Sequence, residues 1–349
     1  MSEKAAVRSR KTLLTLCISA VFLALLLQPD TASSAVRRAA ESFCTRLVPV
    51  LFPYMVLSHF FCTYGLLDPL DALVPAGKLF RMEKGAFPVF LMGHLCGYPV
   101  GAKMAVETVR QGRLGRGQGA VLCAVSSGAS PAFLLYVAGD ACWNDIRFGG
   151  VLLGMQVVLG LAGGMVLGRR VQEEGISVLP SRTEQPFSRC FCEAVGGSAL
   201  QLVSIGGYIV FFSLLVEILP FPRRTAAFGA ACLEFSTGTR LAAETGGYQG
   251  LFCTGFAAGF GGISVLAQTA HMLSGSGISL RPYVGFKLFS GAVCGAAAMG
   301  YGRMFPEILS GQPAAAVILQ NGGNIRAAVL LWMLGMMWYF LGERQGRER

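Results

Sequence analysis

The chain contains a series of apolar runs, each about 18 residues or longer, separated by short polar segments. An α-helix of this length crosses the hydrocarbon core of a bilayer, which is about 30 Å thick. Hydrophobic residues make up 53% of the 349 positions and charged residues only 14%, whereas a soluble domain has roughly a quarter charged residues. The sequence therefore predicts an all-α, polytopic membrane protein with about eight transmembrane helices and the membrane lipid as a partner.

Charge and cysteine content narrow the function further. The formal net charge is +10, but the basic residues occur in short groups between apolar runs, as orientation signals do, so no nucleic-acid partner is expected. The 11 cysteines include no Cys-x-x-Cys pair, and we predict neither a metal site nor a cofactor. No P-loop motif and no catalytic arrangement is evident, so the chain is not expected to be an enzyme. Whether a cation or a proton is a coupling ion stays open.

The chain divides into five parts by composition. They are an N-terminal span with an amphipathic connection (1–46), a first repeat (47–140) with a hairpin at 86–112, a linking span with a cytoplasmic loop (141–194), a second repeat (195–273) with a hairpin at 225–247, and C-terminal spans (274–349). Residues 13–35 are interpreted either as a cleaved signal or as a retained span. Basic residues near both ends predict cytoplasmic termini in a multi-pass protein of the cell membrane. Homo-oligomerisation is open.

The stretch at residues 93–103, Gly-His-Leu-Cys-Gly-Tyr-Pro-Val-Gly-Ala-Lys, interrupts an apolar segment with glycine and proline. Residues 86–96 are too few to cross a membrane alone, and Gly97, Pro99 and Gly101 break the helix. Two short arms around a broken tip predict a re-entrant hairpin. Non-helical backbone at such depth is tolerated only against protein or a water-filled cavity.

A second stretch matches the first. Residues 101–108, Gly-Ala-Lys-Met-Ala-Val-Glu-Thr, align with residues 238–245, Gly-Thr-Arg-Leu-Ala-Ala-Glu-Thr. Each repeat consists of a span, a broken hairpin and a broken span, and the one extra span between them inverts the second repeat. Inverted repeats with discontinuous helices are typical of secondary transporters.

The predicted site lies at the two hairpins. Lys103 and Arg240 follow the broken tips and can converge on a solute with two negative groups. Equally, each can pair with the carboxylate four residues later, Glu107 or Glu244, and these carboxylates are also candidates for a coupling proton. The other predicted solute contacts are backbone or polar positions near the tips and helix breaks: Gly97, Tyr98, Gly101, Ser127, Ser130, Gly238 and Thr239. His94 can equally be a buried histidine of the core or a functional residue.

The hairpin at 93–103, followed by Ser127-x-x-Ser130-Pro131, resembles the sporulation integral membrane proteins of the YlbJ type. These are placed in the nucleoside-recognition Gate superfamily, with concentrative nucleoside transporters. The resemblance spans roughly residues 40–305 and is weaker at the second hairpin, which lacks the tyrosine and proline. It implies a protein of endospore-forming bacteria that moves dipicolinic acid, a planar dicarboxylate, across a mother-cell-derived membrane around the forespore.

Three functions are consistent with these features. The first is a secondary-type transporter of a small planar anion that works by alternating access. The second is a carrier of nucleosides or of another small organic solute. The third is a non-transporting Gate-type membrane scaffold that needs a partner.

Overall fold

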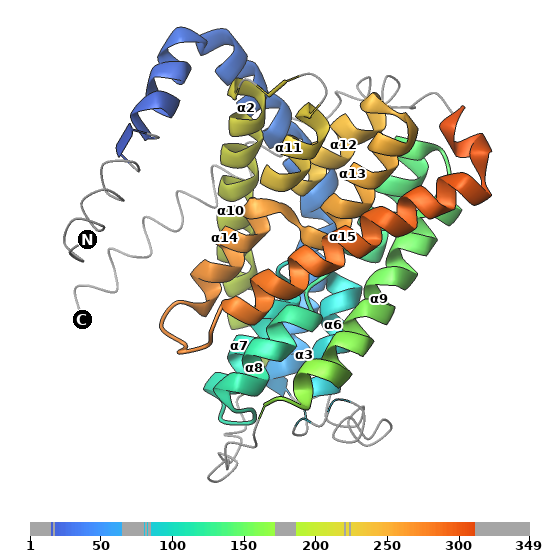
Figure 1. Cartoon of the computed structure of the whole chain (residues 1–349). Helices are drawn as coiled ribbons and strands as arrows, with labels where there is room; N and C mark the ends of the chain where they lie inside the picture. The colour runs from blue at the N-terminus through green and yellow to red at the C-terminus, as the bar shows by residue number, and fades with distance from the viewer. Residues whose placement is uncertain are drawn as a thin grey trace, which may run out of the picture.

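The computed structural model describes residues 15–16, 18–64, 80, 82, 85–171, 186–219, 221–222 and 225–310. Regular structure in these ranges is helical, and no strand is found there (Figure 1). The helices are α2 (Pro29–Ser42), η1 (Phe43–Leu47), α3 (Val48–Tyr64), α6 (Ala86–Cys96), α7 (Val100–Arg110), α8 (Arg116–Val125), η2 (Phe133–Cys142), α9 (Ile146–Gly168), α10 (Phe187–Ile218), α11 (Ala226–Leu233), α12 (Phe235–Thr245), α13 (Gly247–Phe260), α14 (Gly262–Leu273), α15 (Arg281–Met304) and η3 (Pro306–Leu309). Both chain ends, residues 311–349 of the predicted C-terminal spans and residues 172–185 of the predicted cytoplasmic loop lie outside the described residues.

Four helical segments of the described part are long and apolar enough to cross a membrane: α9, α10, the consecutive α13 and α14, and α15. A fifth is formed if Ile18–Leu27 and Pro29–Leu47, which meet at 100°, are one bent span. The predicted class of all-α polytopic membrane protein is confirmed. Helix α3 has 17 residues and ends at Tyr64, where the described residues stop, and the predicted broken span of the first repeat divides into α8 and η2.

The first hairpin is formed by α6 and α7, which pack against each other. Each has 11 residues, which corresponds to a length of about 16 Å, half of the hydrocarbon core. Residues 97–99 join them and are called the first tip. Gly97 has a φ of +80°, and the Tyr98–Pro99 peptide bond is cis. A positive φ suits glycine, and proline has no N–H to continue a helix, so the local sequence ends α6 here.

The second hairpin is formed by α11 and α12, which also pack against each other. Glu234 separates them in an extended conformation, with φ −142° and ψ 121°. Glu234 and Phe235 are called the second tip. The predicted broken segment is therefore present, although a carboxylate at the start of α12, rather than glycine or proline, marks the break.

Each hairpin is followed by a broken span. Residues 126–130, the first break, are non-helical between α8 and the helical turn that begins at Pro131. Gly261, the second break, has a φ of +86° between α13 and α14. In Figure 1 the hairpin that follows α3 lies at the lower end of the bundle and the hairpin that follows α10 at the upper end. This opposite placement is the relation that an inverted repeat has.

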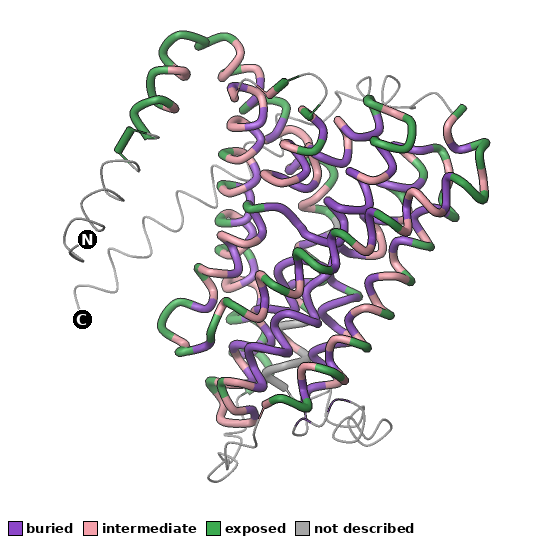
Figure 2. Tube along the Cα trace, in the orientation of Figure 1, coloured by how far each residue is buried: buried purple, intermediate pink, exposed green. Residues whose placement is uncertain are grey.

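Helices α13 and α15 pack closely through small residues. A Cβ on Gly255 would lie 2.3 Å from the carbonyl oxygen of Cys294, and a Cβ on Gly259 would lie 2.5 Å from that of Ser290. Small residues four apart allow such close backbone approach between membrane helices. Most of the α13–α14 span is buried in the protein, whereas most of α9 is not (Figure 2). The broken span is therefore enclosed by the other helices.

Candidate functional site

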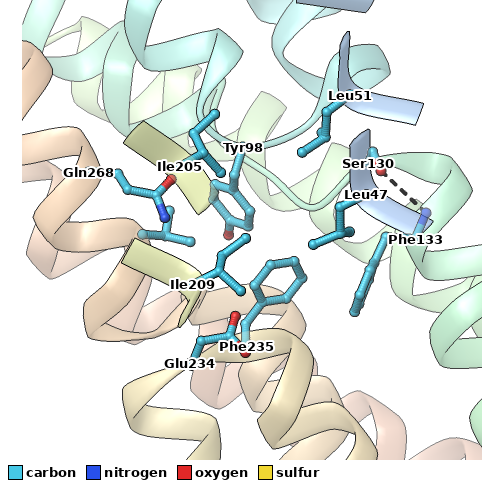
Figure 3. A pocket seen from close by; sticks show the side chains of 11 residues that line it. Leu47, Leu51, Tyr98, Ser130, Phe133, Ile205, Ile209, Glu234, Phe235 and Gln268 are labelled. Carbon is cyan, nitrogen blue, oxygen red and sulfur yellow. Dashed lines mark hydrogen bonds between the residues drawn. The ribbon is translucent and has the colours of Figure 1, made fainter. Parts of the chain in front are cut away.

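A buried cavity lies between the two tips (Figure 3). Its volume is about 40 Å³, which is room for about three water molecules. Both tips, η1, η2 and residues of α3, α10, α14 and the first break form the wall. The lining residues are Leu47, Leu51, Tyr98, Ser130, Phe133, Ile205, Ile209, Glu234, Phe235, Val265 and Gln268.

The first tip contacts the broken span of the second repeat. The Tyr98 hydroxyl donates to the carbonyl oxygen of Ala258, on α13, at 3.4 Å. A Cβ on Gly261 would lie 3.0 Å from the Tyr98 ring, so the second break leaves room for this ring only because glycine is there. The position of Tyr98 therefore depends on the geometry of the second break.

The second tip contacts the broken span of the first repeat in return. The rings of Phe235 and Phe133, which follows the first break, have centroids 4.5 Å apart. The Tyr98 ring meets Phe235 edge-on at 5.8 Å, which joins the two tips directly. Aromatic pairs at these separations are favourable. Each tip thus packs against the break of the opposite repeat, and three rings from different elements face one cavity (Figure 3).

Glu234 is a charged residue of the wall that sequence reasoning did not select. Its side chain is fully buried. Its carboxylate accepts hydrogen bonds from the Ser236 amide at 3.1 Å, the Ser236 hydroxyl at 2.6 Å and the Thr237 amide at 2.7 Å. These bonds cap α12, where a negative charge is also favoured by the helix dipole. The available signal in the sequence was a carboxylate in the middle of the predicted hairpin at 225–247.

Lys287, on α15, is a second charged residue that sequence reasoning missed. Its side chain is 1% exposed. The ammonium nitrogen donates to the carbonyl oxygen of Ser127 at 2.9 Å and lies 4.8 Å from the centroid of the Tyr98 ring. A lysine inside an apolar run was the available signal, because a charge at membrane depth usually has a function.

The first break is held by side chains from two other helices. Besides the bond from Lys287 to Ser127, the amide of Ala129 donates to Gln156 Oε1, on α9, at 2.8 Å. The hydroxyl of Ser127 donates to the carbonyl of Cys123 at 2.7 Å. Ser127 was predicted to contact solute, but both its hydroxyl and its carbonyl have protein partners, and the cavity wall does not include it. Ser130 does line the cavity.

Arg240 makes the intrahelical pair that the spacing allowed. Its guanidinium lies 2.6 Å from Glu244 Oε1 and 3.7 Å from Glu217 Oε1, on α10. Arg38, on α2, also pairs with Glu217, at 3.4 Å. The Arg240 side chain is 42% exposed. Exposed pairs of this kind contribute about 0.3–0.5 kcal/mol.

Lys103 is half-buried on α7, one turn beyond the first tip. Glu107 accepts a hydrogen bond from the Gln111 side chain at 2.9 Å. The cavity wall includes neither Lys103 nor Arg240. In this conformation the structure therefore does not bring the two predicted cations together at the cavity, and their contact with solute stays a prediction.

The predicted glycine positions have packing roles. A Cβ on Gly97 would lie 2.6 Å from the amide nitrogen of Ser130, and one on Gly101 would lie 2.3 Å from the carbonyl oxygen of Ser126. Gly97 and Gly101 therefore let the first hairpin reach the first break of its own repeat.

In the second hairpin, a Cβ on Gly238 would lie 2.4 Å from the Cα of Ala231. The Thr239 hydroxyl donates to the carbonyl of Phe235 at 2.7 Å. Gly238 therefore lets the two arms of this hairpin approach closely, whereas the Thr239 bond lies within α12. His94 is buried, and its Nδ1 lies 3.0 Å from the carbonyl oxygen of Phe90, as expected for a core histidine.

Among the described residues, no group of three or more His, Cys, Asp and Glu side chains is placed to hold a metal ion.

The fold and the cavity define a polytopic, all-α membrane protein with two broken hairpins. The chain is similar to a protein described as "Sporulation integral membrane protein YlbJ" of Bacillus subtilis (strain 168). The two are 22% identical over 326 aligned residues, which cover 79% of this chain and 80% of that protein. This similarity confirms the predicted resemblance to YlbJ-type sporulation membrane proteins. No family model and no solved structure matches the chain.

Proposed function

We propose that the chain is a secondary-type transporter that moves a small planar anionic solute, such as dipicolinate, during sporulation by alternating access. The observation that carries the proposal is the crossed packing of the tips. Tyr98 of the first tip lies against Gly261, and Phe235 of the second tip lies against Phe133. Broken helices from inverted halves that meet at one buried cavity are the arrangement that transporters use for solute binding.

The cavity is too small for the proposed solute in this conformation. Its volume of about 40 Å³ is too small for an aromatic dicarboxylate, since a water molecule alone needs about 10–15 Å³ by this measure. Binding therefore requires a tip to move away from the opposite break. Because the two hairpins lie at opposite ends of the bundle (Figure 1), movement of one tip opens the cavity from one side while the other tip keeps the second side closed.

The walls favour a planar solute. The rings of Tyr98, Phe133 and Phe235 offer faces and edges for stacking. Lys103 and Arg240 are the cations that we expect to approach the solute once the tips separate. The proposed role in sporulation rests on the name of the relative. We propose the membrane around the forespore as the location, with both termini in the cytoplasm.

A second candidate, a carrier of nucleosides or another small organic solute, is favoured by one observation. The polar side chains of the wall are Ser130, Glu234 and Gln268, and these can exchange hydrogen bonds with an uncharged base or sugar.

Flux into vesicles that contain the purified full chain distinguishes these functions. We expect radiolabelled dipicolinate to enter faster than uridine, and both faster than into protein-free vesicles. Phe235→Trp, which enlarges a ring in the cavity wall, should slow entry, whereas Phe289→Trp, on the exposed face of α15, should not. Entry of uridine alone would establish the second candidate, and entry of neither solute would refute transport.

A further inference from the structure

We infer that Lys287 is the proton-binding site that couples ion movement to solute movement, an inference that rests on the proposed transport function. The ammonium group occupies a place that a metal ion would take in other broken helices, beside the Ser127 carbonyl that the first break leaves without a helical partner. A tethered amine at this carbonyl makes a bound sodium ion unnecessary there. The ion that can be exchanged is then the proton of the lysine.

The surroundings of Lys287 allow two protonation states. The titratable groups that face it are His94 of α6, Cys123 of α8, Tyr98 of the first tip and Cys294 of its own helix. Within the described residues no carboxylate pairs with it. Burying an ammonium without a counter-ion costs several kcal/mol, and a lysine so placed changes its protonation state readily.

The protonated form depends on the first tip. One carbonyl and one ring face are the groups that stabilise the ammonium, and the ring belongs to Tyr98, which also lines the cavity. A desolvated cation–π contact contributes about 2 kcal/mol. When solute moves Tyr98, this contact is lost, so solute binding changes the affinity of Lys287 for a proton. By linkage, the proton changes the affinity for solute by the same factor.

The first break is also held by Gln156, whose side chain has no titratable group. Gln156 Oε1 accepts a hydrogen bond from the amide of Ala129 at 2.8 Å, and a side-chain amide does not change its protonation. Loss of the proton from Lys287 therefore weakens the hydrogen bond on the Ser127 side of the break, because a neutral amine donates more weakly than an ammonium, and the bond to Gln156 stays as one fixed point. This asymmetry allows the break to shift without unfolding.

The test uses the purified full chain in vesicles, with the voltage clamped at zero by potassium and valinomycin. One proton per solute permits accumulation of roughly tenfold per pH unit of gradient. We expect wild-type dipicolinate or uridine accumulation to follow a pH gradient and to ignore a sodium gradient. In Lys287→Met the pH effect should disappear while exchange of labelled for unlabelled solute continues. Arg281→Met, which removes an exposed cation at the start of the same helix, should behave as wild type.

Two outcomes overturn the inference and leave transport standing: accumulation driven by sodium, and a pH effect that survives in Lys287→Met. If Lys287→Met does not remain monodisperse in detergent, Lys287→Arg replaces it, because arginine keeps its proton and the same loss is expected. If the wild type moves neither solute under any gradient, the transport function fails and this inference fails with it.

Discussion

The contact between the first hairpin and the first break leads to a quantitative prediction for Gly101→Ala. The added methyl carbon would lie 2.3 Å from the carbonyl oxygen of Ser126, and a Cβ at Gly93, on the other arm, would lie 2.0 Å from the same oxygen. Ordinary van der Waals contact begins near 3.4 Å. The methyl group therefore forces the backbone of the break or the hairpin to move by about 1 Å in a densely packed interior.

The magnitude follows from two opposing effects. Overpacking of this kind costs about 1–3 kcal/mol, while replacing glycine by alanine inside a helix stabilises by about 0.5–1 kcal/mol. Gly154→Ala, on α9, is the matched control, because no atom lies within 4 Å of the new Cβ. Gly154→Ala should therefore show only the stabilisation that alanine gives in a helix. The free energies of unfolding of the two variants should then differ by the overpacking cost, about 1–3 kcal/mol.

The assay is the fraction of monodisperse protein that remains after heating in detergent, measured by size-exclusion chromatography. Each kcal/mol corresponds to about 2–4 °C for a large domain, so we expect Gly101→Ala to lose stability at a temperature about 2–12 °C lower than Gly154→Ala. Equal midpoints for the two variants would refute the close approach of the hairpin to Ser126.

The remaining predictions concern charged side chains. Lys103→Ala and Arg240→Ala should each abolish dicarboxylate flux in vesicles without loss of folded protein, and normal flux in both would leave the ion pairs as the whole role of these residues. Glu234→Gln should lower stability by about 1–2 kcal/mol through its cap, while Glu244→Gln, in an exposed pair, should change it by less than about 0.5 kcal/mol; equal effects would contradict the cap. Asp145→Asn should destabilise at pH 7, with a difference that shrinks as the pH falls below 4; a constant difference would argue against a charge effect.

The pH dependence at Asp145 has a definite sign. Partial burial tends to raise the pKa of this carboxyl, but hydrogen bonds from Tyr301 at 2.6 Å and from Arg147 at 3.1 Å outweigh it, so the pKa lies below the usual 3.8. A carboxyl whose pKa is lowered by folding stabilises the protein above its unfolded pKa. That contribution is lost as the pH falls through the folded value.

Local sequence chemistry was sufficient to predict the breaks. Gly97 and Pro99 end α6 because one adopts a positive φ and the other lacks an N–H, and both properties belong to the residue itself. The same holds for Gly261. The hairpin at 86–112 could be placed for this reason, whereas the hairpin at 225–247, whose break is at Glu234, was indicated by the matched spacing of the charged residues in the repeat.

Which residues come together at the site could not be predicted from local sequence. Lys287 follows both hairpins by more than forty positions in the chain and reaches the first break only because α15 packs on α8 and α13. Its role depends on the distance between segments far apart in sequence. For Arg240, the spacing was consistent both with a solute contact and with an ion pair to Glu244. The structure shows the ion pair.

The central claim is that the cavity between the tips opens to each side of the membrane in turn. Ser130→Cys places a thiol in the cavity wall with little change in size, and mass spectrometry of the peptide that contains residue 130 reports its modification by a membrane-impermeant thiol reagent. We predict modification when the reagent is supplied from either side, slowed from both sides by dipicolinate. Modification from one side only, or from neither, would contradict alternating access through this cavity.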